Sequence, residues 1–373
     1  AGPLGSADDT RCTPAESDGQ LLFVAREPMT IVIGMPKGVI AMPTALDRIR
    51  WFIEDNLVFG MPVLFFLLLS GVWWFNGRDP KGRHTIIAEY EPPEGMDPVS
   101  MGTLLDATVH SQDVAAGIVG LAVKGHLTMG PQGDEKSPKN WTLTKKAGGK
   151  EPLNAIESAL LVKLFESGDE TTLSTTQGTM KKLFDDTAAR TYERLAKENY
   201  FVRHPQRVRG FFYGVAVVFA LVGWFLPLGI AGTVSFGLIA LEFALFGKFM
   251  PKVTHKGALA RDHARGFKLF LETAERDRLK WQEKEGMFEQ YLPYAIVFGV
   301  VALWAKAFAG SLASAPSWYV GTHWNPMHFT SSMDSFSSTL GSAVRPAAAS
   351  GKSGFGGGGF SGGGFGGGGS SSW

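Results

Sequence analysis

The sequence predicts a helical membrane protein with three spans. The end of an extracytoplasmic β domain precedes the first span, and an α+β, winged-helix-like cytoplasmic domain lies between the first and second spans. Long uncharged apolar runs, changes of composition at their ends and short β-rich runs near the start support this prediction. The averages over all 373 residues hide the pattern, because the net charge is only +1. A single cysteine, Cys12, excludes an internal disulfide framework and zinc sites built from cysteine pairs.

Composition divides the chain into six expected segments. They are the end of an extracytoplasmic β domain (1–43), a first span (51–77), a cytoplasmic winged-helix-like domain (78–205), a hairpin of two spans (210–249), a cytoplasmic amphipathic helical region (250–310) and a disordered Gly/Ser-rich tail (311–373). Because the chain begins with Ala and no apolar signal segment comes first, we expect it to be the later part of a longer protein. Residues 2–6 match either a protease-cleavage scar or native sequence.

Residues 20–34 contain two short β-rich runs separated by a Glu-Pro turn. We expect them to be the last strands of the extracytoplasmic domain. Cys12 lies just before them, and outside the membrane an odd cysteine predicts either a disulfide partner in an upstream part or a free buried thiol. Both interpretations stay open.

The run from Asn56 to Gly77 contains no charged residue. About 20 apolar residues are enough to cross the hydrocarbon as a helix, so we expect a first span here rather than a buried helix of a soluble core. Trp51, Trp73 and Trp74 lie near its two ends, where amphipathic rings favour the lipid interface.

Residues 210–247 are also apolar and are long enough for two helices. Pro227 and two glycines interrupt the run near its middle, so we expect a hairpin with spans near 211–228 and 232–249. Lysines and arginines flank both outer ends and none lies in the turn, and such residues stay on the cytoplasmic side. We therefore expect the turn outside and the segment between the first and second spans inside.

Residues 291–305 are apolar but short for a span, and Pro293 lies near their start. We expect an interfacial or packed helix, with a fourth span as the alternative. The choice decides which side of the membrane carries the C-terminal tail.

The expected cytoplasmic domain has the element order of a winged helix. Helices are expected at 98–108 and 111–124 (with Ser111 as N-cap), strands at 126–129 and 141–144, and further helices at 153–166 and 177–198. Binding to DNA phosphates needs an excess of cations, but residues 76–210 hold equal numbers of basic and acidic side chains. We therefore expect contacts with proteins and no nucleic-acid partner.

Basic residues after the hairpin form a candidate lipid-headgroup surface. They are Lys248, Lys252, Lys256, Arg261 and Arg265. The same region carries an apolar stripe on an expected helix, made of Leu259, Phe267, Phe270 and Leu271. Cations beside a span can rest on anionic lipid; the alternative is a solvated helix that packs on the cytoplasmic domain.

From residue 311 on, the chain is nearly uncharged, and residues 354–373 are mostly Gly and Ser with regularly spaced Phe. Such a tract cannot bury enough apolar surface to offset the entropy of ordering it, so we expect disorder. The aromatic side chains could form weak contacts, but a flexible tether is the simpler interpretation.

Outside the Gly-rich tail, the sequence contains no HExxH, Walker-type or Gly-x-Ser-x-Gly motif, and no Rossmann fingerprint opens an expected helix. His255 and His263 lack the further ligands that a metal site needs, so we expect no enzyme activity, cofactor or metal. Glu242 is the one candidate functional or pairing residue, because an ionised carboxylate inside a span is costly. It either bonds to another span and holds the bundle together, or serves a proton or ion pathway.

Short motifs follow one another along most of the chain from residue 77 on. They are Gly77-Arg78-Asp79-Pro80, Tyr90-Glu91-Pro92-Pro93-Glu94-Gly95, Met250-Pro251 with Thr254 and Gly257, Gly266-Phe267, the run from Leu271 to Asp277, Leu292-Pro293-Tyr294-Ala295 and a Gly-rich tail ending in Trp. In these motifs the chain resembles the YciQ-like family of predicted bacterial membrane proteins, whose function is unknown. The resemblance implies an envelope location and supplies no catalytic residues. Members begin with a signal peptide and a complete β domain, of which we expect only the end here.

These observations predict a multi-pass protein of the bacterial cytoplasmic (inner) membrane whose partners are the lipid bilayer and unidentified proteins. We expect a non-enzymatic envelope scaffold or adaptor that joins an extracytoplasmic β module to cytoplasmic partners. The alternatives are a component of a transport or channel assembly that uses Glu242, and a membrane-tethered DNA regulator.

Overall fold

The structure, a computed structural model, describes only part of the chain. The described residues are 15–17, 20–22, 43–83, 85–133, 138–149, 151–173, 177–273, 286–308, 315–321 and 326–344. Cys12, residues 2–6 and the Gly-rich end of the tail lie outside them, as does most of the region predicted to be β-rich. Internal contacts divide the chain into two units, Ala1–Gly60 and Met61–Trp373.

The first unit contains a small antiparallel pair of strands and a helix. Strands β1 (Ala15–Ser17) and β2 (Gln20–Leu22) pair with Ala15 opposite Leu22. Helix α1 (Ala45–Asn56) is followed by the 3₁₀ turn η1 (Leu57–Phe59). Two three-residue strands do not identify a domain, so the extracytoplasmic β domain stays a prediction.

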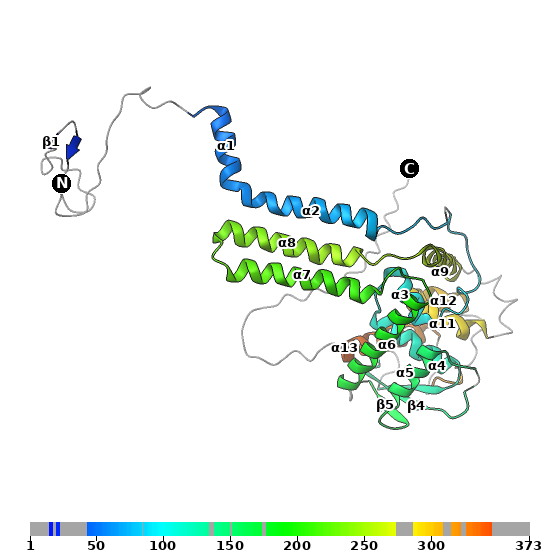
Figure 1. Ribbon diagram of the computed structural model, residues 1–373. Helices are drawn as coiled ribbons and strands as arrows, with labels where there is room; N and C mark the ends of the chain where they lie inside the picture. Colours follow the sequence, from blue (N-terminus) through cyan, green and yellow to red (C-terminus); the bar gives the residue numbers. More distant parts are fainter. Residues whose placement is uncertain are drawn as a thin grey trace, which may run out of the picture. The chain divides into compact units, whose positions relative to one another are not determined.

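Among the described residues, three helical segments are long and apolar enough to cross a membrane (Figure 1). They are Leu57–Gly77, which comprises η1, α2 (Gly60–Val72) and the π-helical turn η2 (Trp73–Gly77), then α7 (Pro205–Phe225) and α8 (Gly229–Phe249). The predicted pair of apolar helices is present as α7 and α8, and their insertion as a transmembrane hairpin stays a prediction. The first helix of the pair begins earlier than expected, since Pro205 suits the first helical turn, and Gly229 makes the connection in the left-handed region with φ +67°.

The three apolar helices pack side by side (Figure 1). Glycines and aromatic rings make the contacts between them. In the hairpin, Gly223 lies against Phe236, where a Cβ on the glycine would come within 2.7 Å of the Phe236 Cβ. Phe65 of α2 meets both Phe219 of α7 and Phe243 of α8, with ring centroids 5.2 and 6.0 Å apart. Most side chains on the outer faces remain exposed, as expected for helices surrounded by lipid.

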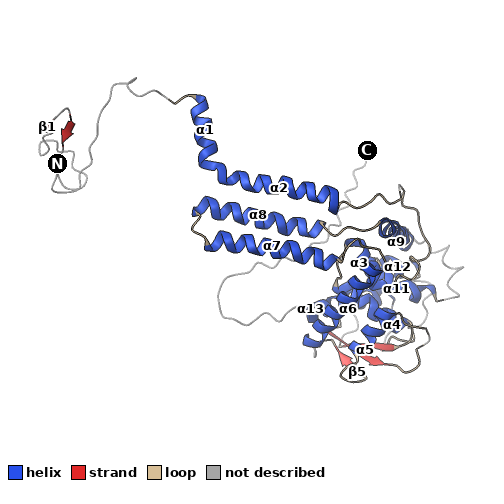
Figure 2. Cartoon of the chain, viewed as in Figure 1, coloured by secondary structure: helices blue, strands red, loops and turns tan. Residues whose placement is uncertain are grey.

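Eight further described helices and a small sheet form the helical domain (Figure 2). The helices are α3 (Pro98–Asp106), α4 (Ser111–Val123), α5 (Ala155–Leu164), α6 (Gln177–Lys197), α9 (His255–Thr273), α11 (Met287–Phe298), α12 (Val301–Ala307) and α13 (Pro326–Val344). The antiparallel sheet has the order β3 (Leu127–Gln132), β4 (Asn140–Lys145) and β5 (Glu170–Thr172). Met129 lies opposite Leu143 in this register.

Helix α4 is the centre of this domain, and residues 113–122 are all buried. A helix that is apolar on every side needs neighbours all round, and α3, α5, α11 and α13 pack against it. The order helix, helix, hairpin is as predicted, but the would-be recognition helix cannot enter a DNA groove because it is buried. The winged-helix assignment itself stays a prediction.

The N-cap of α4 is His110, not Ser111 as expected. The backbone N–H of His110 donates to Oδ2 of Asp113 at 2.7 Å, which fixes the start of the helix one residue earlier. Sequence preference alone favoured the hydroxyl, but the reciprocal bond from the third helical residue decides the position.

Two expected helices are packed in the core. Residues 291–305 lie in α11 and α12, with Leu292 and Trp304 fully buried, which agrees with a packed helix and not with a fourth span. In α9, Phe267, Phe270 and Leu271 of the predicted stripe are buried, whereas Leu259 is 37% exposed and does not belong to it.

The expectation of disorder over 311–373 is wrong for residues 326–344, which form α13. This helix packs on α4 and α6 through one apolar face. The buried residues of that face are Phe329, Met333, Phe336, Leu340 and Ala343. Tyr319 also lies beside Met129 in an isolated parallel bridge at the edge of β3. The apolar residues of α13 have a regular helical spacing, but the tail as a whole is rich in Gly and Ser, and its composition predicts disorder.

Candidate functional site

At the C-terminal end of α3, residues close to the ends of the apolar helices form hydrogen bonds with the helical domain. The helix ends at Ala107, which is in the left-handed region with φ +62°. The last carbonyl groups of a helix have no partner within it and attract cations. Two arginines from other elements supply such cations here.

Arg209 lies in the second turn of α7 and reaches this end of α3. Its Nη1 donates to the carbonyl oxygen of Ala107 at 2.6 Å, and its Nη2 to that of Asp106 at 3.2 Å. The second apolar helix is therefore bonded to α3 immediately before it leaves the domain.

Arg261 of α9 reaches the same end of α3 from the other side of the hairpin. Its Nε donates to the carbonyl oxygen of Leu104 at 3.1 Å, and its Nη1 donates to Oδ2 of Asp79 at 2.7 Å. Oδ1 of Asp79 accepts the backbone N–H of Val253 at 2.9 Å. Asp79 follows the first apolar helix by two residues, so this pair joins the end of that helix and the segment after α8 to α3.

We call this group the α3 anchor: Asp79, Leu104, Asp106, Ala107, Arg209 and Arg261. It contains Asp79 just after the first apolar helix, Arg209 near the start of α7, and Arg261 of α9, the helix that follows α8 along the chain. Each guanidinium group also interacts favourably with the negative end of the helix dipole. At an exposed helix C-terminus one such cation stabilises the helix by about 0.3–1 kcal/mol. The anchor therefore both caps α3 and fixes the span ends to it.

A second contact strengthens the link between the first apolar helix and α9. The backbone N–H of Arg83 donates to Oδ2 of Asp262 at 2.7 Å, and Asp262 is buried. Its other oxygen accepts Nη1 of Arg265 at 3.1 Å. The chain after the first span thus lies along α9 over several residues.

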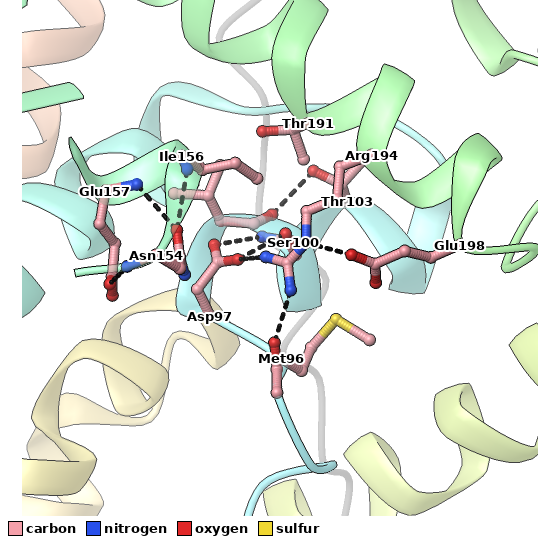
Figure 3. Close-up of polar contacts among 12 residues, drawn as sticks. Met96, Asp97, Ser100, Thr103, Asn154, Ile156, Glu157, Thr191, Arg194 and Glu198 are labelled. Carbon is pink, nitrogen blue, oxygen red and sulfur yellow. Dashed lines mark hydrogen bonds and ion pairs between the residues drawn. The ribbon is translucent and has the colours of Figure 1, made fainter. Parts of the chain in front are cut away.

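The other end of α3 is fixed by a buried ion pair (Figure 3). Asp97 is the N-cap and accepts the Ser100 backbone N–H at 2.9 Å, while Arg194 of α6 donates to its Oδ2 at 2.5 Å. Arg194 also donates to Glu198 at 2.8 Å. Nearby, Glu157 of α5 pairs with Lys124 at 2.7 Å. Both ends of α3 are therefore held by charged groups from distant elements.

The loop between α3 and α4 carries a titratable cluster next to the anchor. His110 Nε2 lies 2.7 Å from Oδ2 of Asp106, and this hydrogen bond raises the pKa of His110. Asp113 is buried at the start of α4, and burial raises the pKa of its carboxyl to about 7. Tyr192 of α6 accepts the Val109 backbone N–H at 2.9 Å and closes the cluster on its inner side.

Two motif glycines of α9, Gly257 and Gly266, lie where two backbone segments come close together. A Cβ on Gly257 would lie 2.1 Å from the carbonyl oxygen of Tyr200, and one on Gly266 would lie 2.2 Å from that of Ile87. Thr254 caps the start of α9 by accepting the Gly257 backbone N–H at 3.0 Å. The motif positions that define the family resemblance therefore include the contacts between α9 and the chain around it.

The five basic residues predicted to contact lipid have different environments. Lys248 is exposed in the last turn of α8. Lys252 donates to the Phe75 carbonyl at 3.3 Å, and Lys256 donates to the Glu198 carbonyl at 2.9 Å while lying over the Tyr200 ring. Arg265 pairs with buried Asp262 but remains half exposed.

Arg261 must be reassigned. Its side chain is only 13% exposed and is occupied by Asp79 and the α3 carbonyl, so it belongs to the α3 anchor and not to a lipid-facing surface. The sequence could not show this, because the partners of Arg261 lie more than 150 positions away along the chain.

Glu242 lies on the inner face of α8. Its Oε2 is buried and finds no hydrogen-bond partner among the described residues. The same holds for Oγ of Ser235, which lies two turns earlier on the same face of α8. Ser235 is not among the residues predicted from the sequence, although its spacing of seven residues from Glu242 places it on the same helix face.

Metal ligation has no support among the described residues, where no group of three or more His, Cys, Asp or Glu side chains is close enough to hold an ion. His255 and His263 are not part of such a group. His263 Nε2 lies 3.0 Å from the carbonyl oxygen of Glu91, which is an ordinary structural contact.

These features define a predominantly helical membrane protein whose apolar helices are joined to a helical domain with a small sheet. A family model described as "Predicted membrane protein (DUF2207) C-terminal domain" matches residues 85–308, which is more than half of the chain. The protein therefore belongs to the DUF2207 family of predicted membrane proteins of unknown function. The YciQ-like name stays a prediction. A search among curated proteins found no match, and neither did a search among solved structures.

Proposed function

We propose that this protein is a non-enzymatic scaffold or adaptor of the bacterial cytoplasmic membrane, which joins an extracytoplasmic β module to cytoplasmic partners. The observation that carries the proposal is the α3 anchor, in which Arg209 of α7 is bonded directly to the end of α3 and Arg261 of α9 joins this end to Asp79, just after the first apolar helix. Such an arrangement suits a protein that holds a domain in a fixed position at the membrane.

The core of the helical domain supports a mechanical role. Helix α3 packs directly on α4, and α4 in turn contacts α5, α11 and α13. Packed interiors transmit small displacements because they contain few voids. A force on the span ends would therefore reach the outer helices of the domain through α3 and α4.

The orientation is part of the proposal. Lys and Arg flank the outer ends of the hairpin, and its turn carries none, so the helical domain is assigned to the cytoplasm. The assignment as non-enzymatic rests on the lack of catalytic motifs in the sequence outside the Gly-rich tail.

The test for an adaptor uses photo-cross-linking in whole cells. A photoreactive amino acid replaces Val162 on α5 or Val320 beside β3, two apolar side chains that are 71% and 61% exposed. Glu166, an exposed charged residue just after α5, is the matched control. We expect a protein adduct of reproducible identity at one or both valines and none at the control. If neither valine gives an adduct with a cytoplasmic protein, the adaptor proposal fails.

A second candidate function is a transport or channel component, favoured by one observation. Glu242 and Ser235 present, on one face of α8, two buried oxygens that have no partner in the described part of the chain. Intramembrane polar groups of this kind mark ion or proton pathways, or bonds between helices. Transport predicts proton or potassium flux through proteoliposomes that falls on Glu242→Gln and on Ser235→Ala, but not on Thr233→Ala at an exposed position of α8. Absence of flux, or unchanged flux in Glu242→Gln, rejects this candidate.

A further inference from the structure

Helix α1 presents an apolar stripe that nothing among the described residues covers. Leu46, Ile49, Phe52 and Ile53 are 77%, 56%, 69% and 54% exposed. At 100° per residue these four side chains fall within one third of the helix circumference. Four large apolar side chains on one side of a twelve-residue helix form a surface that is unfavourable in water.

Apart from Trp51, the side opposite the stripe carries charged residues, and local bonds stabilise the helix. Thr44 is the N-cap, and it forms a capping box with Asp47, whose backbone N–H donates to the Thr44 hydroxyl at 3.2 Å. Arg50 Nε donates to Glu54 at 2.8 Å on the polar side. Trp51 lies on the side opposite the stripe. The helix is therefore amphipathic, and its caps do not depend on packing against other elements.

The place of α1 in the chain identifies what covers the stripe. The helix ends at Asn56, and the apolar segment Leu57–Gly77 begins at the next residue. Because no linker separates α1 from the apolar segment, no residue of α1 is further from the point of membrane entry than the length of the helix. Helices that combine a strongly polar face with a large apolar face lie in the plane of the lipid interface instead of crossing the bilayer.

We propose that α1 is an interfacial helix that lies on the leaflet at the Leu57 end of the first span, with its apolar stripe inserted at the boundary between headgroups and acyl chains. The occupant of the stripe is the lipid surface. This inference rests on membrane insertion of the adjacent segment and is independent of the adaptor function. It assigns residues 51–56, which were predicted to belong to the first span (51–77), to an interfacial helix together with residues 45–50.

The test uses the full chain in lipid nanodiscs, with Cys12→Ser and one new cysteine labelled with an environment-sensitive fluorophore. Ile49→Cys reports on the stripe, Leu46→Cys is a second reporter, and Glu54→Cys is the control on the polar side. Lipids with a quencher near the headgroup are compared with lipids with a quencher deep in the chain. We expect shallow quenching at Ile49 and Leu46 that is about threefold or more stronger than at Glu54.

Three results would overturn the proposal. A blue-shifted label at Ile49 without lipid quenching means that protein covers the stripe, either the residues that precede α1 or a second copy of the chain. Equal quenching at Ile49 and Glu54 means that the helix does not lie flat. Fluorescence typical of water at both reporters means that the stripe has no cover. None of these results would affect the cross-linking test of the adaptor function.

Discussion

Arg261 donates a hydrogen bond from Nη1 to Oδ2 of Asp79 at 2.7 Å, although 182 positions and the whole hairpin separate the two residues. Through Nε, the same guanidinium group bonds to the carbonyl oxygen of Leu104 at the end of α3. One side chain therefore connects the exit of the first span, the segment after the third span and the helical domain.

Loss of Arg261 is expected to destabilise the domain. In Arg261→Gln, Oδ2 of Asp79 and the carbonyl oxygen of Leu104 both lose the guanidinium donor, while Oδ1 of Asp79 keeps its bond from Val253, and the loss costs roughly 2–3 kcal/mol because one partner is charged. The measurement is the midpoint of thermal unfolding of the full chain in detergent. The control is Arg190→Gln, whose pair with Asp186 is about half exposed and contributes less than about 1 kcal/mol. Equal effects of the two variants would contradict the role given to the anchor.

The parts of the fold that follow local rules could be predicted from the sequence. The apolar helices are marked by length and hydropathy, and α4 by its helical spacing. The α3 anchor could not be predicted. Arg209 looked like a flanking charge that orients the hairpin, and Arg261 like a lipid contact, because a single sequence contains no signal that pairs either of them with the end of α3. A sequence shows whether a side chain is basic or acidic, but it does not show which distant residue that side chain contacts in the fold.

Helix α13 shows a different cause of error. The low-complexity tail around it led to an expectation of disorder, but Phe329, Met333, Phe336 and Leu340 follow each other at intervals of four, three and four residues. That spacing is the core face of an amphipathic helix. Composition averaged over the whole tail concealed a pattern that a shorter window would have found.

The contribution of α13 can be measured by truncating its central side chain. Phe336 is fully buried and its ring centroid lies 5.4 Å from that of Trp141. We expect Phe336→Ala to lower the free energy of unfolding by about 3–5 kcal/mol, as for other buried aromatic residues. Val320→Ala, at a 61% exposed position, is the control and should change stability little. A change below about 1 kcal/mol in Phe336→Ala would show that α13 does not pack on the core.

Gly257 is expected to be intolerant of even the smallest side chain. A Cβ there would lie 2.1 Å from the Tyr200 carbonyl oxygen, and backbone cannot move aside as a flexible side chain can. We expect Gly257→Ala to cost roughly 1–3 kcal/mol through overpacking, although Ala favours a helix. Gly178→Ala in α6 has open space around it and should be neutral or stabilise by about 0.5–1 kcal/mol. Unfolding midpoints of the two variants, compared with wild type, test the close approach.

Asp113 makes stability depend on pH. Burial raises its pKa from 3.8 to about 7 in the folded state, while an unfolded Asp ionises near 4. Between about pH 4 and pH 7 the folded state therefore binds more protons than the unfolded state, so stability decreases as pH rises through this window. The raised pKa of His110 acts in the same direction, since its stabilising contribution is lost as pH rises through its folded value.

Asp113→Asn should remove most of this dependence. The Asn carbonyl can still accept the His110 backbone N–H, but it carries no charge to desolvate. At pH 8 we expect the variant to be more stable than wild type by up to roughly 4 kcal/mol, which corresponds to a shift of about three pKa units, and at pH 5 the difference should be much smaller. Asp185→Asn, at an exposed pair with Lys181, is the control and should leave the pH profile of the unfolding midpoint unchanged. If wild type and Asp113→Asn have parallel profiles from pH 5 to pH 8, Asp113 is already ionised in the folded domain, and the buried carboxylate must then be stabilised by its bond to the N-terminus of α4.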